Sequence, residues 1–429
     1  MTLTPLYYTY KCLDSIIRQG AFSGIELNKY LTNAKTSDKP MITKLVYGVL
    51  DKDIELRYII NNYTEKVKPS IMPILEIGVY LLKYMNIKDY AAVNETVELS
   101  RDIGKGAMSG FINAVLKKIS SELNENKIKY PQNAQENLSI KYSFPLWAVK
   151  KLIAQIGYEE TEAFLMYEPD YSVTHIRLNP SKINSAKFEE ILIKRGIEYK
   201  PSLVDDAYFV KSDGIKKLED NLYTIQSIGS MLVAQAAQAE GEVLDNCAAP
   251  GGKSVYIKQR TSAEVTACDI YAHRVELIKS YAARMGVKIN AIVNDATKLT
   301  PEFINKFDRV LCDVPCSGYG VYYSKPDIKM NKNDRNIKEL VKLQSEILNQ
   351  ASKYVKVNGK LIYSTCTIFK EENIDVIDEF LKENDFILEK APLPKQLGEA
   401  PYIEGKCVQL YPYRDGTEGF FIAVMRRIK

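Results

Sequence analysis

The first 125 residues repeat an apolar pattern that is typical of amphipathic helices. Five segments place their apolar side chains three and four positions apart, namely 10–20, 41–51, 71–85, 90–104 and 109–123. This spacing gathers the apolar side chains on one face of a helix. Because such faces must be buried against one another, the sequence predicts an all-α bundle over residues 1–135.

Residues 124–143 are polar and rich in asparagine, which predicts an exposed connection between domains. Beyond this connection, helical and extended patterns alternate over residues 136–235. The helical stretches are 146–157 and 186–196, and the extended ones are 174–180, 207–212 and 222–227. This mixture predicts a small α+β intermediate domain.

Strand-like apolar runs alternate with helical patterns over residues 236–429. The strand-like runs are 242–248, 264–270, 289–295, 307–315, 360–366 and 420–428. Such alternation predicts parallel strands joined by crossover helices, which is a doubly wound, Rossmann-like α/β domain. Ligands in this architecture collect at the carboxyl ends of the strands. We therefore expect the chemistry of the protein to lie there.

Composition narrows the class of protein further. The 429 residues are 46% hydrophobic and 26% charged, which is typical of multidomain globular proteins and excludes disordered, collagen-like and coiled-coil chains. No apolar run approaches the ~20 residues of a membrane helix, so a cytoplasmic protein without a membrane partner is expected. The net charge of +4 is too small to indicate whether the protein binds a nucleic acid or another class of partner.

The seven cysteines are odd in number and sparse, so we expect reduced thiols and no disulfide framework. Only two histidines are present and no paired C-x-x-C arrangement occurs, so no metal site is expected.

The loop after the first strand of the α/β domain has the composition of a cofactor site. Its residues are Cys247, Ala248, Ala249, Pro250, Gly251, Gly252 and Lys253. Small side chains let a ligand approach the backbone, and the following helix offers free amide groups. Cys247 stands where a phosphate-binding P-loop needs glycine, and no G-x-G-x-x-G is present. These features favour a nucleoside cofactor without pyrophosphate over a plain strand-to-helix turn.

Three carboxylates follow successive strand-like runs: Asp269, Asp295 and Asp313. Helix capping explains a single aspartate at such a place. Three in series favour a shared ligand, since carboxylates accept hydrogen bonds from ribose hydroxyls and exocyclic amines.

Two thiols, Cys316 and Cys366, each come directly after a strand-like run. The residues alone leave two interpretations open, namely a nucleophile and a small buried hydrophobe. Burial is the interpretation for four others, Cys12, Cys268, Cys312 and Cys407, and Cys247 is interpreted as loop structure.

Four motifs resemble those of the Sun-type family of RNA cytosine-5 methyltransferases: CAAPGGK (247–253), DVPCSG (313–318), STCT (364–367) and EGFF (418–421). Residues 223–230 resemble the Gln-containing segment that precedes them in this family. Segments 45–50, 91–101 and 111–119 resemble helices of a NusB-type RNA-binding domain. This combination is similar to bacterial enzymes that modify small-subunit ribosomal RNA.

The resemblance implies S-adenosyl-L-methionine as cofactor, held by residues 247–253 with Asp269, Asp295 and Asp313. It also implies that Cys366 is the nucleophile, that Cys316 assists product release, and that Asp313 and Lys253 support the chemistry. The implied partner is 16S ribosomal RNA, bound by a monomer. Candidate contacts to the RNA backbone are Lys117, Lys118 and Arg177, although such side chains are more often ordinary solvated residues.

Three alternatives remain. The first is the same chemistry on tRNA or on another ribosomal cytosine. The second is a non-catalytic RNA-binding assembly factor. The third, a DNA cytosine methyltransferase, leaves the Thr-Cys motif and the NusB-like helices unexplained. One departure from the family pattern is Ser324 in place of arginine before Lys-Pro-Asp, which is expected to affect an RNA contact.

Overall fold

A computed structural model of the protein describes residues 4–331 and 333–429. These residues form two compact units. One holds the chain up to Met166 together with Tyr322–Asn333, and the other holds Tyr167–Val321 and Asp334–Lys429. The division into domains 1–135, 136–235 and 236–429 stays a prediction. None of the helices described is both long and apolar enough to cross a membrane.

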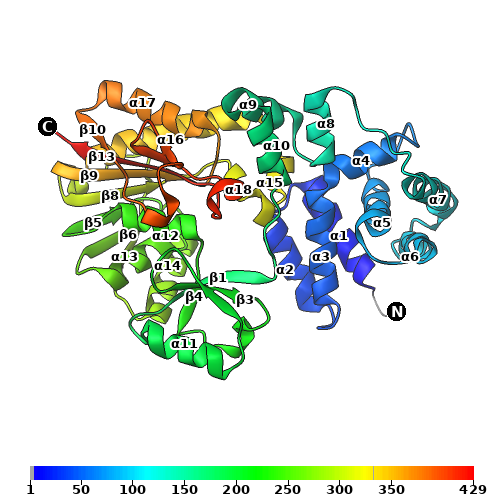
Figure 1. Ribbon diagram of the computed structural model, residues 1–429, viewed down its shortest axis with the longest axis horizontal. Coiled ribbons are helices and arrows are strands. Elements are labelled where there is room, and N and C mark those ends of the chain that lie inside the picture. Colours follow the sequence, from blue (N-terminus) through cyan, green and yellow to red (C-terminus); the bar gives the residue numbers. More distant parts are fainter. Residues whose placement is uncertain (1–3, 332) are drawn as a thin grey trace. The chain divides into compact units, whose positions relative to one another are not determined.

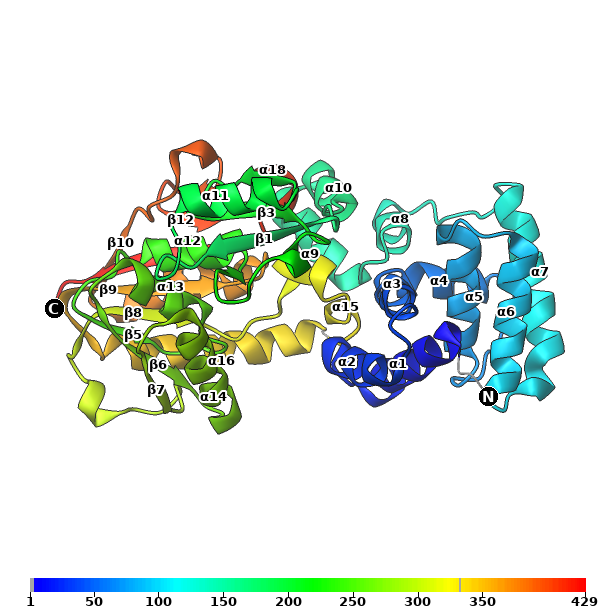
Figure 2. The same ribbon diagram turned by 90° about the horizontal axis from the view of Figure 1, so that it is seen from below.

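The first unit is helical throughout (Figures 1 and 2). Its helices are α1 (Pro5–Gln19), α2 (Ser23–Asn33), α3 (Lys39–Asp51), α4 (Asp53–Asn61), α5 (Met72–Tyr84), α6 (Asp89–Asp102), α7 (Ser109–Asn124), α8 (Ala134–Lys141), α9 (Leu146–Ile156), α10 (Tyr158–Met166) and α15 (Ile328–Asn331). The five helices predicted from apolar spacing are confirmed as α1, α3, α5, α6 and α7.

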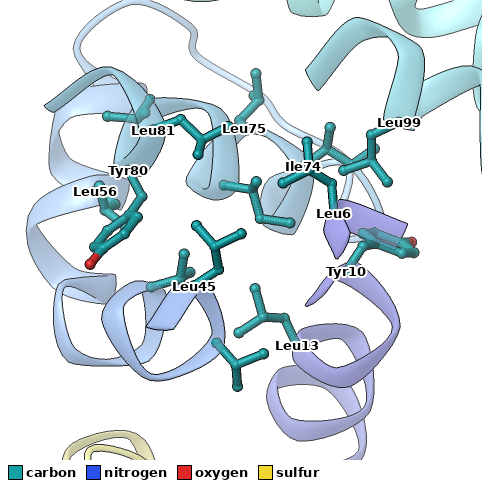
Figure 3. Packing of buried hydrophobic residues seen from close by; sticks show 14 of the residues in the cluster. Leu6, Tyr10, Leu13, Leu45, Leu56, Ile74, Leu75, Tyr80, Leu81 and Leu99 are labelled. Atoms are coloured by element: carbon teal, nitrogen blue, oxygen red, sulfur yellow. The ribbon is translucent and has the colours of Figure 1, made fainter. Parts of the chain in front are cut away.

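Helix α5 lies at the centre of this unit, and every residue from Pro73 to Leu81 in it is buried. Around it, apolar side chains from the neighbouring helices interdigitate (Figure 3). The labelled members are Leu6, Tyr10, Leu13, Leu45, Leu56, Ile74, Leu75, Tyr80, Leu81 and Leu99. A Cβ at Gly48 of α3 would collide with the Tyr80 ring, so glycine lets α3 and α5 approach closely.

The sequence predicted an exposed connection over residues 124–143, but part of this stretch forms helix α8. Asn133 caps α8 by accepting hydrogen bonds from the backbone N–H groups of Gln135 and Glu136, both at 3.1 Å. Leu138 is then 1% exposed, and α8 packs against α4 and α9. Asparagine is common at helix N-caps as well as in turns. The asparagine content of this stretch therefore could not distinguish a short capped helix from a loop.

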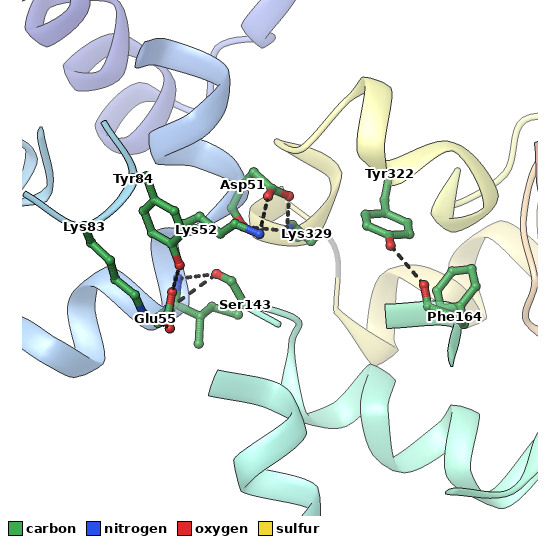
Figure 4. A network of polar contacts seen from close by, with 10 residues as sticks. Asp51, Lys52, Glu55, Lys83, Tyr84, Ser143, Phe164, Tyr322 and Lys329 are labelled. Atoms are coloured by element: carbon green, nitrogen blue, oxygen red, sulfur yellow. Dashed lines mark hydrogen bonds and ion pairs between the residues drawn. The ribbon is translucent and has the colours of Figure 1, made fainter. Parts of the chain in front are cut away.

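The segment 322–333, far along the sequence, is part of the helical unit (Figure 4). Ser23 Oγ donates to Asp327 Oδ1 at 2.7 Å. Lys329 Nζ donates to the backbone oxygen of Asp51 at 2.6 Å and to its Oδ1 at 2.7 Å, and its side chain is only 2% exposed. Asp327, the last residue of the Lys-Pro-Asp motif, and Lys329 therefore anchor this segment among the helices.

We expect Lys329→Met to lower the unfolding free energy of the helical unit by about 1–2 kcal/mol, because the backbone oxygen and Oδ1 of Asp51 lose a buried, charged donor although Lys52 still pairs with Oδ2. The double variant Asp51→Leu/Lys329→Met should recover most of this loss, since neither charge of the Asp51–Lys329 pair then has to be kept out of water. The only tryptophan, Trp147 in α9, lies in this unit, so urea titration followed by its fluorescence measures the effect. Lys29→Met, at an exposed lysine, is the control, and a double variant no more stable than the single one would contradict the expectation.

The second unit begins with a four-stranded antiparallel sheet in the order β2-β3-β1-β4. Its elements are β1 (Val173–Leu178), α11 (Ser185–Lys194), β2 (Tyr199–Pro201), β3 (Ala207–Lys211) and β4 (Tyr223–Ile225). The extended stretches predicted around residues 174, 207 and 222 are confirmed as β1, β3 and β4.

A larger sheet follows in the order β11-β12-β13-β9-β8-β5-β6-β7, with β10 beside β13. Its strands are β5 (Glu242–Asp245), β6 (Glu264–Asp269), β7 (Asn290–Val293), β8 (Phe307–Asp313), β9 (Val355–Thr365), β10 (Phe386–Glu389), β11 (Tyr402–Ile403), β12 (Cys407–Gln409) and β13 (Phe421–Arg427). Strands β5 to β9 are parallel, as predicted. Strand β13 is antiparallel to β9, so the prediction was wrong for residues 420–428.

Helices cover both faces of this sheet (Figure 1). One face carries α12 (Ile228–Ala236), α13 (Gly252–Arg260) and α14 (Ala272–Met285), the other α16 (Asp334–Ser352) and α17 (Ile374–Glu383), and α18 (Pro412–Asp415) precedes β13. From β5 the chain continues to β6 and β7 on one side, whereas β8 and β9 lie on the other. The strand order thus reverses at β5, and the loops after β5 and β8 meet at this switch point, where α/β proteins bind ligands.

Candidate active site

The loop after β5 has the open, small-residue form predicted for a cofactor site. Gly251 has φ +105°, a conformation that side-chain-bearing residues rarely adopt, and its N–H donates to the backbone oxygen of Ala248 at 2.7 Å. Both amide atoms of Asn246 and Oδ1 of Asp245 are buried without a hydrogen-bond partner among the described residues. Buried polar atoms normally have partners, so a polar ligand fits this loop.

The carboxylates of Asp269 and Asp295 follow two adjacent parallel strands, β6 and β7. Asp269 accepts from the N–H of Tyr271 at 3.2 Å and pairs with Arg274 at 3.2 Å. Asp295 accepts from the Thr297 hydroxyl at 2.6 Å, a hydrogen bond that lowers the pKa of Asp295. Carboxylate acceptors at neighbouring strand ends fit the ribose hydroxyls and amine of an adenosine group.

Asp313 ends β8 and is held on both oxygens. Lys253 Nζ donates to its Oδ2 at 2.5 Å, and Ser364 Oγ donates to its Oδ1 at 2.7 Å. Burial alone would lower the pKa of Lys253, but the Asp313 carboxylate outweighs burial and the net effect raises this pKa. Lys253 is therefore a fixed cation at neutral pH beside the end of β9.

The structure brings the thiols of Cys316 and Cys366 together. Their Sγ atoms lie 3.1 Å apart, and the backbone N–H of Cys366 donates to Cys316 Sγ at 3.3 Å. The hydrogen bond with Cys366, together with burial, raises the pKa of Cys316 well above its usual value, so Cys316 is a thiol at neutral pH.

The other cysteines behave as expected. Cys12, Cys268, Cys312 and Cys407 are buried, and Cys247 is partly exposed in its loop. Within residues 4–331 and 333–429, no three His, Cys, Asp or Glu side chains are grouped as metal ligands.

One residue that holds the Cys316 loop was not found from the sequence. Glu372 is fully buried and accepts from the N–H of Ser317 at 2.8 Å and from its hydroxyl at 2.5 Å. Gln344 Nε2 donates to the same carboxylate at 3.0 Å and to the backbone oxygen of Pro315 at 2.9 Å. Glu372 therefore holds Ser317 directly and Pro315 through Gln344, so both neighbours of Cys316 are fixed. It belongs to an ordinary charged run, which carries no local signal of this role.

The candidate RNA contacts divide into exposed and buried residues. Lys117 and Lys118 are exposed on α7. Arg177 is 0% exposed, so its prediction as a surface contact was wrong. From β1 its side chain points toward Gln226 and the Tyr256 ring. Burial lowers the pKa of Arg177 to about 10, which leaves the guanidinium charged at neutral pH.

Sequence comparison identifies methyltransferases and NusB-family proteins as relatives of this chain. A family model described as 16S rRNA methyltransferase RsmB/F matches residues 232–426, and the NusB family model matches residues 7–121. The probable ribosomal RNA small subunit methyltransferase B of Bacillus subtilis is 34% identical over 97% of each chain. Ribosomal RNA small subunit methyltransferase B of Pasteurella multocida is 30% identical over 99% of this chain and 97% of the relative.

Solved structures share the fold. The crystal structure of PH0851 superposes with a TM-score of 0.81 at 23% identity and covers 100% of both chains. NSun6 from Pyrococcus horikoshii with SFG has a TM-score of 0.57 at 20% identity over 70% of this chain and 98% of that one. The chain thus belongs to the RsmB/F family of S-adenosylmethionine-dependent methyltransferases, and in this chain a NusB-family helical domain precedes the Rossmann-like domain.

Proposed function

We propose that the protein transfers a methyl group from S-adenosylmethionine to carbon 5 of a cytosine in 16S ribosomal RNA, through a covalent bond between Cys366 and the base. The observation that carries the proposal is the contact of two thiols, 3.1 Å apart, next to the Lys253–Asp313 pair at the switch point. The RNA substrate rests on the names of the relatives and on the NusB-family match.

The first step is addition of the Cys366 thiolate to carbon 6 of the cytosine. Carbon 5 is a poor nucleophile until this Sγ–carbon bond forms and moves an electron pair into the ring. The Asp313 carboxylate accepts a hydrogen bond from the exocyclic amine, which orients the base. Negative charge develops on the ring, and the nearby Lys253 cation stabilises it. Lys253 and Cys366 are close enough to interact electrostatically.

The second step forms the carbon 5–methyl bond, for which the cofactor supplies the methyl group. Water then accepts the carbon 5 proton, the electron pair of that C–H bond re-forms the carbon 5–carbon 6 double bond, and the carbon 6–Sγ bond breaks with its pair on the Cys366 thiolate. Cys316 contacts the departing sulfur and assists this release. Residues 247–253, with Asp269 and Asp295, bind the cofactor. Both faces of carbons 5 and 6 must be accessible, so the target cytosine is single-stranded or flipped out of a helix.

The test is transfer of labelled methyl from S-adenosylmethionine to unmodified 16S ribosomal RNA, followed by mapping of the modified nucleotide. We expect 5-methylcytosine at a defined position, with tRNA as the parallel substrate. Label on tRNA alone would change the substrate and keep the chemistry. Absence of label on both RNAs, with the cofactor shown to bind, would contradict the proposal and favour a non-catalytic RNA-binding role.

A further inference from the structure

A pocket of about 430 Å³ opens beside the Lys253–Asp313 pair in the second unit. Its lining has three parts besides Asp313. They are residues 224–227 with Ser230, residues 248–250 with Gly252 and Lys253 from the loop proposed to bind the cofactor, and Tyr281 with Arg284 on α14. We propose that this pocket binds a phosphodiester of the RNA strand next to the target cytosine, with Arg284 as its direct ligand. The proposal deepens the proposed function and rests on it.

Arg284 is an exposed cation in a fixed orientation. Its Nη1 donates to the backbone oxygens of Asp220 and Tyr223 at 2.7 and 3.1 Å, and its Nη2 donates to Thr224 Oγ1 at 3.1 Å. These partners are neutral, and Arg284 makes no ion pair with a described residue. Its Nε–H and one Nη2–H are without a protein acceptor in the described part of the chain. A guanidinium held in this way is prepared for a charge-assisted, two-point contact with phosphate oxygens.

A second positive charge lies behind the pocket wall. Arg177 is fully buried, and no described carboxylate pairs with it. Its Nε donates to Gln226 Oε1 at 2.9 Å, and Gln226 is a wall residue. Nη2 of Arg177 has no hydrogen-bond partner among the described residues. A buried charge without a counter-charge is costly, and an anion in the adjoining pocket would provide one.

The remaining lining suits a nucleotide rather than a simple inorganic anion. Asp313 is the acidic residue of the lining, and Lys253 neutralises it. Ile225 is 63% exposed at the pocket, and the Arg284 guanidinium lies 5.1 Å from the centre of the Tyr281 ring. Apolar and aromatic surface next to a cation is typical of sites that contact a nucleotide through both base and phosphate.

The direct test is Arg284→Gln in the full chain, with unmodified 16S ribosomal RNA as the probe. We expect the Kd and KM for RNA to rise by about tenfold, and the slope of log Kd against log salt to fall by about 1, as for loss of one phosphate contact. The kcat at saturating RNA and the Kd for S-adenosylmethionine should stay unchanged. Arg284→Lys should recover part of the loss, and Lys279→Gln, on the same helix and paired with Glu276, is the control.

A second pair of variants covers the case in which Arg284→Gln disturbs β4. Ile225→Asp adds a negative charge to the pocket, and Ile225→Asn has nearly the same shape without the charge. We expect the aspartate variant alone to weaken RNA binding severalfold. Two results would overturn the proposal. The first is an unchanged RNA Kd in Arg284→Gln together with equal effects of the two Ile225 variants on RNA binding. The second is weaker binding of S-adenosylmethionine by Arg284→Gln. RNA binding is measured without methyl transfer, so failure of the proposed chemistry and failure of this site are distinguishable.

Discussion

Cys366→Ala is expected to abolish methyl transfer, with a loss on the order of 10⁴-fold or more, because no other group adds to carbon 6 and removal of a nucleophile disables the whole sequence of steps. Transfer of labelled methyl to 16S ribosomal RNA under saturating RNA and cofactor measures the loss. The thiol is small and only partly buried, so the melting temperature and the Kd for S-adenosylmethionine should change little.

The matched control is Cys407→Ala in β12, which removes a buried thiol from the same sheet. This variant should keep its kcat even where its stability falls. Full activity of Cys366→Ala, combined with inactivity of Cys316→Ala, would reverse the roles of the two thiols. Sequence spacing and the 3.1 Å contact are symmetric with respect to this choice; the assignment comes from the resemblance of the Thr-Cys and Pro-Cys motifs to those of the family.

Cys316→Ala has the opposite expected signature, namely accumulation of protein bound covalently to methylated RNA. The Cys316 Sγ lies against the sulfur that must leave, so its loss should slow release at least a hundredfold while addition and methylation proceed. The measurement is an RNA-shifted band that survives denaturing gel electrophoresis and contains label from the cofactor.

The double variant Cys316→Ala/Cys366→Ala tests whether this band depends on Cys366. It should show no shifted band. A shifted band of equal intensity in the double variant would place the covalent bond on another residue, and absence of the band in Cys316→Ala with normal turnover would remove Cys316 from the release step.

The sequence predicted the strand ends and their loops because each depends on local pattern. Apolar runs gave strands β5 to β9, and the small residues of 247–253 gave a loop that a ligand can approach. Parallel order then required the loops after β5 and β8 to meet. The antiparallel direction of β13 was missed because it depends on pairing with β9, which is distant in the sequence. The local pattern of apolar residues does not indicate the partner of a strand or its direction.

The same limit explains the positions of three side chains. Arg177 was predicted at the surface because arginine is usually solvated, whereas the register of β1 turns it inward. Glu372 holds the Cys316 loop from a segment 55 residues away. Lys329 pairs with Asp51 across 278 residues. Each contact joins residues that only the fold brings together.

The position of residues 322–333 within the helical unit has a consequence for synthesis of the chain. At ~5–20 residues per second, translation needs roughly ten to thirty seconds between completion of α10 and completion of this segment. During that interval Asp51 has no Lys329 to bind, and Ser23 has no Asp327. The helical unit therefore gains its last contacts only after most of the chain has been synthesised. Its folding cannot be completed when its N-terminal helices alone are available. A fragment that ends at Met166 would remain in this incomplete state permanently.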